Sequence, residues 1–189
     1  GQLGKMLLAE TRKFDIQTYV LDPSKDAPSQ FGASQFYIGS LIDFDTVYQF
    51  GKMVDLLTIE IENVNLDALD RLESEGLHIF PSPKTLRLIQ NKGKQKDFYA
   101  ENAIPTSKHH RFVDLNDLRK SLEKDEIEFP FVWKCAQFGY DGNGVKIVRS
   151  ALDLINLPDV ECIAEDMVPF KNELAVIVTR SVSGELKTY

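Results

Sequence analysis

A lysine and a cluster of glycines stand close together in the second half of the chain, in a pattern that can bind phosphate. Lys134 ends an apolar run, and Gly139, Gly142 and Gly144 follow it. Glycine lets backbone N–H groups approach a phosphate without a Cβ in the way, and lysine supplies a compact positive charge for its oxygens. Glycine-rich turns without a ligand are also common, so the pattern alone leaves both interpretations open.

The elements around this loop limit the kind of phosphate site that it can form. Residues 129–133 are apolar and residues 145–148 return to a strand-like pattern, so we expect the loop to join two antiparallel strands. No Gly-Lys-Ser/Thr opens a helix here, which excludes a Walker-type P-loop. A strand rather than a helix follows, which excludes a dinucleotide fingerprint. The remaining interpretations are a plain turn and a hairpin loop that folds over a ligand.

The composition is that of a globular, acidic protein. The chain has 189 residues, of which 43% are hydrophobic and 27% charged, with a formal net charge of −7 and a pI of about 5.0. Such a charge disfavours nucleic-acid binding. No apolar run approaches a membrane span, and no signal peptide is recognised. Cys135 and Cys162 lack metal-ligand spacing, so we expect free thiols in a reducing cytoplasm.

The first half alternates strand-like and helix-like segments, which predicts a parallel sheet with helices on both faces. We expect residues 1–4 to form a turn before a helix that reaches about Phe14. Asp43 and Asn65 are expected to cap helices, and Gly76 to end the second one. The expected strands are residues 16–21, 36–38, 56–61 and 77–80.

Polar residues fall at the carboxyl ends of these strands, where ligands of parallel sheets bind. They are Asp22, Glu60, Glu62, Asn63 and Ser82. Strand alternation predicts that Glu60 and Glu62 share one face, where they fit either a ligand contact or a solvated edge. Asp22 and Ser82 fit either a ligand contact or a turn or cap.

The second half is predicted to be α+β. The helical residues 83–102 include the lysine tract Lys92, Lys94 and Lys96, which fits either a solvated face or an anion site. A strand over 108–113 and a helix capped by Asp114 are expected next, followed by the hairpin of residues 129–133 and 145–148 described above. The last expected elements are a short helix over 151–156, a strand over 162–164 and a hairpin of 174–182 with 186–189. His78, His109 and His110 lack metal or triad spacing and are expected to be structural.

Eight segments resemble, in the same order, one protein family. They are GQLGKML at 1–7, LDP at 21–23, EIENV at 60–64, PSP at 81–83, NKGKQK at 91–96, IPT at 104–106, VWKCAQFGYDGNG at 132–144 and EDMVPFKNELAVIV at 165–178. The family is 5-(carboxyamino)imidazole ribonucleotide synthase, the ATP-dependent carboxylase of bacterial purine biosynthesis and a member of the ATP-grasp superfamily. The GYDG loop and the E-x-x-V-P-F segment are specific as a pair.

The resemblance implies a domain organisation. A Rossmann-like preATP-grasp domain would span residues 1–81, a helical linker 82–105, an ATP-grasp lid 106–168, and the start of the central ATP-grasp domain 169–189. It also implies a chain truncated at both ends, with the magnesium-binding carboxylates and the ribonucleotide-phosphate contacts beyond Tyr189. We therefore expect no metal site within this chain, and no turnover by residues 1–189 alone.

The resemblance further implies roles for single residues. Lys134 would meet the α- and β-phosphates of ATP, Glu173 the ribose hydroxyls, and Lys92 the nucleotide, where relatives often have arginine and its bidentate fork. The loop that closes over the triphosphate would be Gly139, Tyr140, Asp141, Gly142, Asn143, Gly144 and Val145. The adenine edge would be read by Glu165, Asp166, Met167 and Val168. Substrate contacts are implied for Gln2, Leu3, Glu62, Tyr140 and Asp141, whereas Asn143 departs from the lysine or arginine that is common there.

The implied reaction is the carboxylation of 5-aminoimidazole ribonucleotide with ATP, Mg²⁺ and bicarbonate, through carboxyphosphate, by a cytoplasmic homodimer. No nucleic-acid or membrane partner is expected. One alternative is another ATP-grasp ligase, such as formate-dependent glycinamide ribonucleotide transformylase, whose loop is serine-rich instead of GYDG. The other is a nucleotide-binding module without catalysis. A structural domain without a ligand is disfavoured by Lys134, the glycine loop and Glu173 together.

Overall fold

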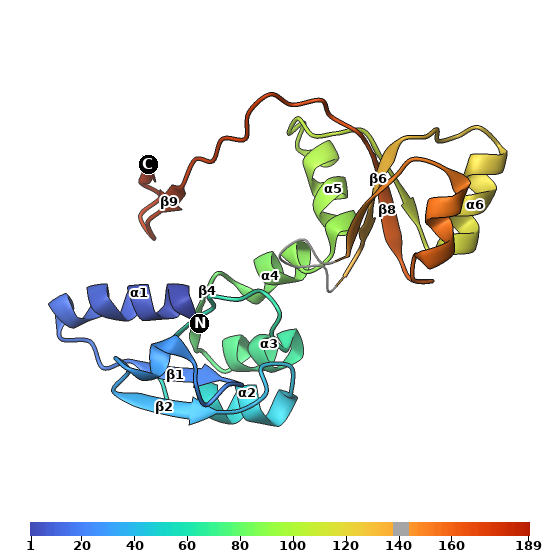
Figure 1. The fold of residues 1–189 in the computed structure, drawn as a ribbon. Helices are drawn as coiled ribbons and strands as arrows, with labels where there is room; N and C mark the ends of the chain where they lie inside the picture. Colours follow the sequence, from blue (N-terminus) through green and yellow to red (C-terminus); the bar gives the residue numbers. More distant parts are fainter. Residues whose placement is uncertain (138–143) are drawn as a thin grey trace.

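The computed structural model of the protein describes residues 1–137 and 144–189. The first part of the chain is an α/β unit, drawn in blue to green in Figure 1. Its elements are α1 (Gln2–Thr11), β1 (Tyr19–Asp22), β2 (Gln35–Ile38), α2 (Phe44–Gly51), β3 (Leu56–Thr58), α3 (Leu66–Ser74) and β4 (His78–Phe80). β1 pairs with β2 and β3 with β4, both in parallel, which confirms the predicted strand direction. The described strands form two separate two-stranded sheets instead of one.

Short polar side chains start the helices of this unit, as predicted. The carboxylate of Asp43 accepts the N–H of Thr46 at 2.8 Å, and the amide oxygen of Asn65 accepts the N–H of Ala68 at 2.9 Å. α2 and α3 then bury their apolar faces against β3 and β4. The resulting core consists of Val47, Phe50, Leu57, Val64, Ala68, Leu69, Leu72, Ile79 and Leu86.

Three local expectations for this unit were wrong. Residues 2–4 are helical instead of a turn, because the helix already starts at Gln2 and the N–H of Lys5 bonds to the carbonyl of Gly1. The first strand starts at Tyr19, three residues later than predicted from Ile16. Glu60 and Glu62 lie beyond β3, which ends at Thr58, so strand alternation does not place them on one face.

Asp22 and Ser82 take the local roles that the sequence left open. The carboxylate of Asp22 accepts the N–H of Ser24 in a turn at 2.9 Å. The hydroxyl of Ser82 accepts the N–H of Thr85 and caps α4 (Pro83–Ile89). α5 (Lys92–Glu101) follows directly, and these two helices connect the α/β unit to the second sheet (Figure 1).

The second sheet is four-stranded and antiparallel, in the order β5-β8-β6-β7. Its strands are β5 (His109–Phe112), β6 (Phe131–Cys135), β7 (Val145–Val148) and β8 (Cys162–Asp166), and α6 (Leu115–Glu123) lies between β5 and β6 in the chain. The predicted hairpin of β6 and β7 is confirmed. One face buries Phe131, Trp133, Cys162 and Ala164 together with residues of α6. The opposite face carries Lys134 and Glu165 and lies toward α5.

The last hairpin, β9 (Val178–Arg180) with β10 (Leu186–Thr188), lies apart from both sheets in Figure 1. The predicted strand 174–182 was too long, because only Val178–Arg180 is a strand and an extended segment precedes it. Every residue from Asp166 to Tyr189 is exposed, with Leu174 at 93% and Val182 at 95%. A two-stranded hairpin without a packed face is only marginally stable by itself.

Candidate functional site

A buried carboxylate holds two lysines at the centre of the second sheet. Lys134 lies 2.8 Å from one carboxylate oxygen of Glu165, and Lys96 lies 3.1 Å from the other. The hydroxyl of Ser107 donates to Glu165 at 3.1 Å and accepts from Lys96 at 3.0 Å. Lys96 also donates to the hydroxyl of Thr106. We call Lys96, Ser107, Lys134 and Glu165 the lysine–glutamate cluster.

Burial and charge both act on this cluster. The side chains of Glu165 and Lys96 are only 8% and 11% exposed, whereas that of Lys134 is 27% exposed. Burial alone would raise the pKa of Glu165, but the hydrogen bond and charge of Lys134, followed by those of Lys96, outweigh it and lower the pKa. The carboxylate is thus ionised at neutral pH, and two ammonium groups against one carboxylate leave a net charge of +1 on the cluster.

The register of the sheet brings Lys134 to Glu165. Val132 lies opposite Glu165 and Lys134 lies opposite Ile163, so the lysine and the glutamate are diagonal neighbours on one face. The same register places the core residues of β6 on the other face, which fixes the direction of Lys134. Lys96 reaches Glu165 from α5, which packs against β8. Three elements distant in sequence therefore build the cluster.

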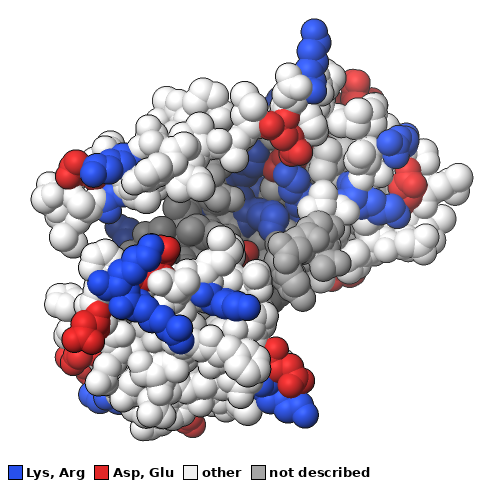
Figure 2. Space-filling model, turned by 60° about the vertical axis from the view of Figure 1, so that its left-hand side comes forward, with Lys and Arg blue, Asp and Glu red and all other residues white. Residues whose placement is uncertain are grey.

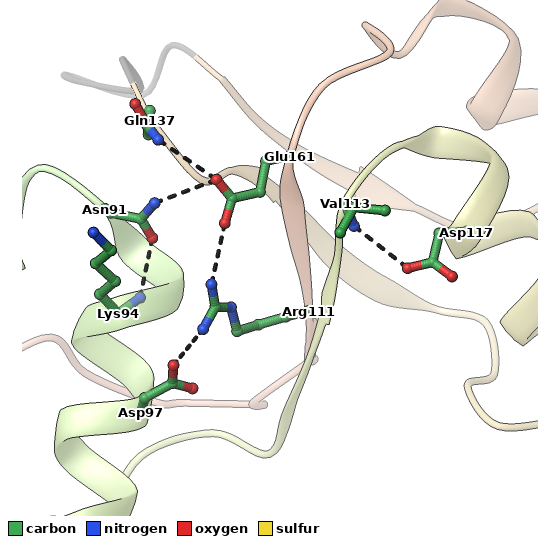
Figure 3. Close-up of polar contacts among 8 residues, drawn as sticks. All are labelled: Asn91, Lys94, Asp97, Arg111, Val113, Asp117, Gln137 and Glu161. Carbon is green, nitrogen blue, oxygen red and sulfur yellow. Dashed lines mark hydrogen bonds and ion pairs between the residues drawn. The ribbon is translucent and has the colours of Figure 1, made fainter.

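A second polar network fastens α5 to the sheet (Figure 3). The carboxylate of Glu161 accepts hydrogen bonds from Arg111 at 3.2 Å, from Asn91 at 3.3 Å and from Gln137 at 3.5 Å. Arg111 also forms an ion pair with Asp97 of α5. Beside this network the N–H of Lys92 bonds to the carbonyl of Ala136 at 2.8 Å. The start of α5 is therefore fixed to the end of β6, where the glycine-rich loop begins.

A cavity of about 360 Å³ lies where the α/β unit meets these elements. Its polar lining includes Glu62, Asn63, Lys92 and Gln137, and its apolar lining includes Ile61 and Ile89. Figure 2 shows the molecule hollowed at its centre, with Lys and Arg side chains in the hollow although the chain is acidic overall. Gln137 is three residues beyond Lys134 and lies just past the end of β6, so the cavity is next to the end of the strand that carries Lys134.

The structure brings together some of the predicted site residues and separates others. Lys134 and Glu165 meet, while Glu62 and Lys92 line the cavity instead of joining them. Gly144 has the positive φ of 73° that a glycine turn requires, and Val145 begins β7. The predicted loop residues Gly139, Tyr140, Asp141, Gly142 and Asn143 lie outside the described part of the chain.

Other predicted residues are exposed. Gln2 and Leu3 lie at the start of α1, where the N-terminal nitrogen of Gly1 is 3.1 Å from Asp22 and 3.8 Å from Glu60. Asp166 ends β8, and Met167 and Val168 follow it in the exposed segment. Glu173 lies further along this segment, and the structure does not bring it to Lys134. The carboxylate of Glu165 is occupied by the two lysines, so the acidic side chain that remains exposed at this end of β8 is that of Asp166.

Sequence reasoning named Lys96 only as part of the lysine tract, and it missed Ser107 and Glu161. One interpretation of the tract was a solvated face, but Lys96 is buried. The usable signal was the helical spacing, because Lys92 and Lys96 are four residues apart on one face while Lys94 points elsewhere and is exposed. Ser107 and Glu161 carry no local signal, since their roles depend on strands that pair across the sheet.

Comparisons with known proteins agree with this architecture. Residues 1–90 match the family described as the ribonucleotide synthetase preATP-grasp domain, and residues 97–189 match the ATP-grasp domain. The chain is 33% identical over 195 residues to the chloroplastic phosphoribosylaminoimidazole carboxylase of Vigna aconitifolia. This alignment covers all of this chain and 34% of that protein.

Solved structures give the same result. The chain resembles the carboxyaminoimidazole ribonucleotide synthase of Aspergillus clavatus complexed with ATP, with 34% identity and a TM-score of 0.88. It also resembles the N5-carboxyaminoimidazole synthase of the same organism in complex with ADP and 5-aminoimidazole ribonucleotide, with 33% identity and a TM-score of 0.85. All of this chain and 50% of each of those chains are covered, so the chain spans about half their length. The chain belongs to the ATP-grasp superfamily, and it joins a ribonucleotide synthetase preATP-grasp domain to an ATP-grasp domain.

Proposed function

We propose that the protein is a 5-(carboxyamino)imidazole ribonucleotide synthase, which carboxylates 5-aminoimidazole ribonucleotide with bicarbonate at the expense of ATP in purine biosynthesis. The observation that carries the proposal is Lys134, which belongs to a cluster of net charge +1 and precedes a glycine-rich loop, next to a polar cavity of about 360 Å³. The solved relatives with ATP, and with ADP and 5-aminoimidazole ribonucleotide, support the same pair of ligands.

In this proposal the two adjoining sites bind the two substrates. Lys134 neutralises the phosphates of ATP, and the loop from Gly139 to Val145 covers them. The segment Glu165 to Val168 borders the adenine, and Lys92 and Glu173 complete the nucleotide contacts. The ribonucleotide lies toward the cavity, where Glu62 lines the wall. Gln2, Leu3, Tyr140 and Asp141 are the further proposed substrate contacts.

The chemistry follows from the poor leaving group of bicarbonate. Attack of a bicarbonate oxygen on the γ-phosphorus of ATP releases ADP and forms carboxyphosphate, which has phosphate as its leaving group. The exocyclic amine then attacks the carboxyl carbon, or the carbon dioxide released from it, and phosphate departs. Positioning and charge neutralisation supply most of the catalysis for phosphoryl transfer. Here Lys134 provides the positive charge, and a closed loop would exclude water from the intermediate.

Magnesium normally accompanies ATP in such a reaction, and we propose it as the cofactor. Among the described residues, however, no group of three or more His, Cys, Asp or Glu side chains could hold a metal ion. Mg²⁺ is usually held by one or two carboxylates together with the phosphates of ATP, and we propose that the carboxylates that hold it lie outside residues 1–189.

The remaining features of the proposal concern the whole protein. We propose the domain division 1–81, 82–105, 106–168 and 169–189, a homodimeric state and a cytoplasmic location. Cys135 and Cys162 are free thiols, which is compatible with a reducing compartment. Within the described residues no helix is long and apolar enough to cross a membrane. Sedimentation analysis of the full-length protein tests the homodimer.

The experiment that tests the proposed function is ADP release by the full-length protein with ATP, magnesium and bicarbonate, with and without 5-aminoimidazole ribonucleotide. We expect release that depends on the ribonucleotide, together with formation of its carboxylated product. Formate plus glycinamide ribonucleotide serves as the matched substrate pair. Release with that pair alone would assign the protein to the other ligase, and ATP binding without any release would indicate a binding module.

A further inference from the structure

Lys96 is fully engaged by the protein itself. An ammonium group has three donors, and those of Lys96 point at three oxygens: a carboxylate oxygen of Glu165, the hydroxyl of Ser107 and the hydroxyl of Thr106. Its side chain is 11% exposed and lies beneath the sheet on α5. Lys96 thus has neither the access nor a spare donor for a ligand.

Lys134 differs from Lys96 in both respects. Its described contact is a single carboxylate oxygen, at 2.8 Å, and its side chain is 27% exposed. Both lysines share one carboxylate, so their charges are not equivalent. Lys96 is buried and all three of its N–H donors have partners, whereas Lys134 is partly exposed and can direct further N–H donors toward a ligand.

The charge balance gives Lys96 a role that contact alone would not suggest. If Lys134 and Glu165 were alone, they would form a neutral pair with little attraction for an anion. With Lys96 present, Glu165 is already balanced from the inside. We propose that Lys96 is a positioning residue that neutralises Glu165, so that Lys134 keeps an uncompensated positive charge for the phosphates of ATP. This inference rests on the proposed function, in which Lys134 binds those phosphates.

A purely structural role makes a different prediction. A buried ion pair is costly to break, because removing one partner leaves an unpaired charge. Under that explanation Lys96→Met lowers the thermal stability of the fold, and any loss of ATP binding follows the loss of stability. Under the charge-balance explanation, Glu165→Gln compensates Lys96→Met. The net charge is +1 in the native cluster, 0 in Lys96→Met, and again +1 in the double variant.

The test is calorimetric titration of ATP into the full-length protein and its variants. We expect Lys96→Met to weaken ATP binding about tenfold or more, and the double variant Lys96→Met/Glu165→Gln to recover most of that loss. Lys94→Met is the matched control, because it removes the same charge from an exposed position of the same helix. It should change the affinity by less than about twofold. Thermal unfolding of each variant monitors the fold.

Two results would overturn the inference. One is an ATP affinity of Lys96→Met equal to that of the native protein, and the other is a double variant that binds ATP as weakly as Lys96→Met.

Failure of the native protein to bind ATP would instead reject the proposed function. In that case the rate at which a dilute amine-acylating reagent modifies Lys134, mapped by mass spectrometry, still tests the charge balance. Lys96→Met should slow this reaction, because Glu165 then pairs with Lys134 alone and holds its amine against the sheet, and the double variant should restore the rate. Equal rates in all three proteins would contradict the inference.

Discussion

At the scale of single residues, Lys134 is the side chain on which the proposed nucleotide site depends. Replacing it with alanine removes the one exposed cation of the lysine–glutamate cluster and leaves a neutral Lys96–Glu165 pair. We expect Lys134→Ala to weaken ATP binding by about 1.5–3 kcal/mol, roughly 10- to 150-fold, the scale of a hydrogen bond to a charged group. Calorimetry on the full-length protein measures this. Lys124→Ala, at an exposed helix end, is the control, and equal affinities in both variants would remove Lys134 from the site.

Glu165 should leave a signature in the acid stability of the protein. Burial raises its pKa, but Lys134 and then Lys96 lower it below the ordinary value of 4.5. Because the pKa is lower in the folded state, the stabilisation is complete above that ordinary value and is lost as pH falls through the folded pKa. Urea unfolding from pH 6 to pH 3 should therefore show a steeper loss below about pH 4.5 in the native protein than in Glu165→Gln. Parallel curves would contradict this, and Glu123→Gln serves as an exposed control.

Local sequence predicted some of these residues and not others. Lys134 and Gly144 were predictable because a strand end and a glycine turn are local patterns. Lys96 was not, because its burial depends on which face of α5 packs against a sheet formed far away in sequence. Glu173 was predicted from a family pattern, yet in the structure it lies in an exposed segment, because the strand expected to begin there starts only at Val178.

At the scale of elements, the register of β6 and β8 can be tested chemically. Cys135 and Cys162 lie directly opposite each other. The N–H of Cys135 bonds instead to Gly144, and that of Ala136 bonds to Glu161, so the cysteines form a non-hydrogen-bonded pair, whose side chains approach most closely. We expect a diazene oxidant such as diamide to take two electrons and two protons from these thiols and form an intrachain disulfide.

Attack should begin at Cys135. Burial raises the pKa of Cys162 to about 11, so that thiol stays protonated at neutral pH, whereas Cys135 is only partly buried. Mass spectrometry of the peptides and a count of free thiols before and after oxidation measure the product. Cys162→Ser, which keeps one thiol, is the control. Persistence of both thiols in the oxidised native protein would show that the register differs.

Packing between α2 and α3 gives a second prediction for the elements. A Cβ on Gly51 would lie 2.3 Å from a methyl carbon of Leu72, which is 1% exposed. Gly51→Ala should therefore destabilise the fold by about 1–3 kcal/mol through overpacking. Gly4→Ala is the matched control, because Gly4 also lies within a helix, α1, and a Cβ there would meet Ser29 at an ordinary contact distance of 3.6 Å. This substitution should stabilise the fold by about 0.5–1 kcal/mol. Urea denaturation measures both, and a stabilised Gly51→Ala variant would contradict the packing.

The boundaries of the elements show what sequence patterns can establish. Helix starts at Asp43, Asn65 and Asp114 were predicted correctly, because each cap is a hydrogen bond to a backbone group three residues away. Strand lengths were less predictable, because a strand extends only as far as its partner does. The strand expected over 174–182 shrank to three residues for this reason, and Glu60 and Glu62 fell outside β3.

At the scale of the whole molecule, the order of the two halves was predictable and their internal assembly was not. Alternating strands and helices, followed by hairpins, predicted an α/β unit and then an α+β unit. The strand order β5-β8-β6-β7 was not predictable, because β8 enters between two strands that precede it in the chain. The position of β8 between β5 and β6 brings Glu165 to both lysines. The site therefore depends on strand pairing between segments that are far apart in the sequence.

The last prediction concerns residues 1–189 as an isolated chain. The described residues contain no metal-binding group of three or more His, Cys, Asp or Glu, and every residue after Glu165 is exposed, including Glu173. ATP bound at Lys134 would thus adjoin an exposed segment, with no such metal-binding group among the described residues. We expect no bicarbonate-dependent ADP release from this chain above the rate in buffer, under conditions in which the full-length protein turns over. Release by the isolated chain that Lys134→Ala abolishes would overturn this expectation and locate the entire catalytic machinery within these residues.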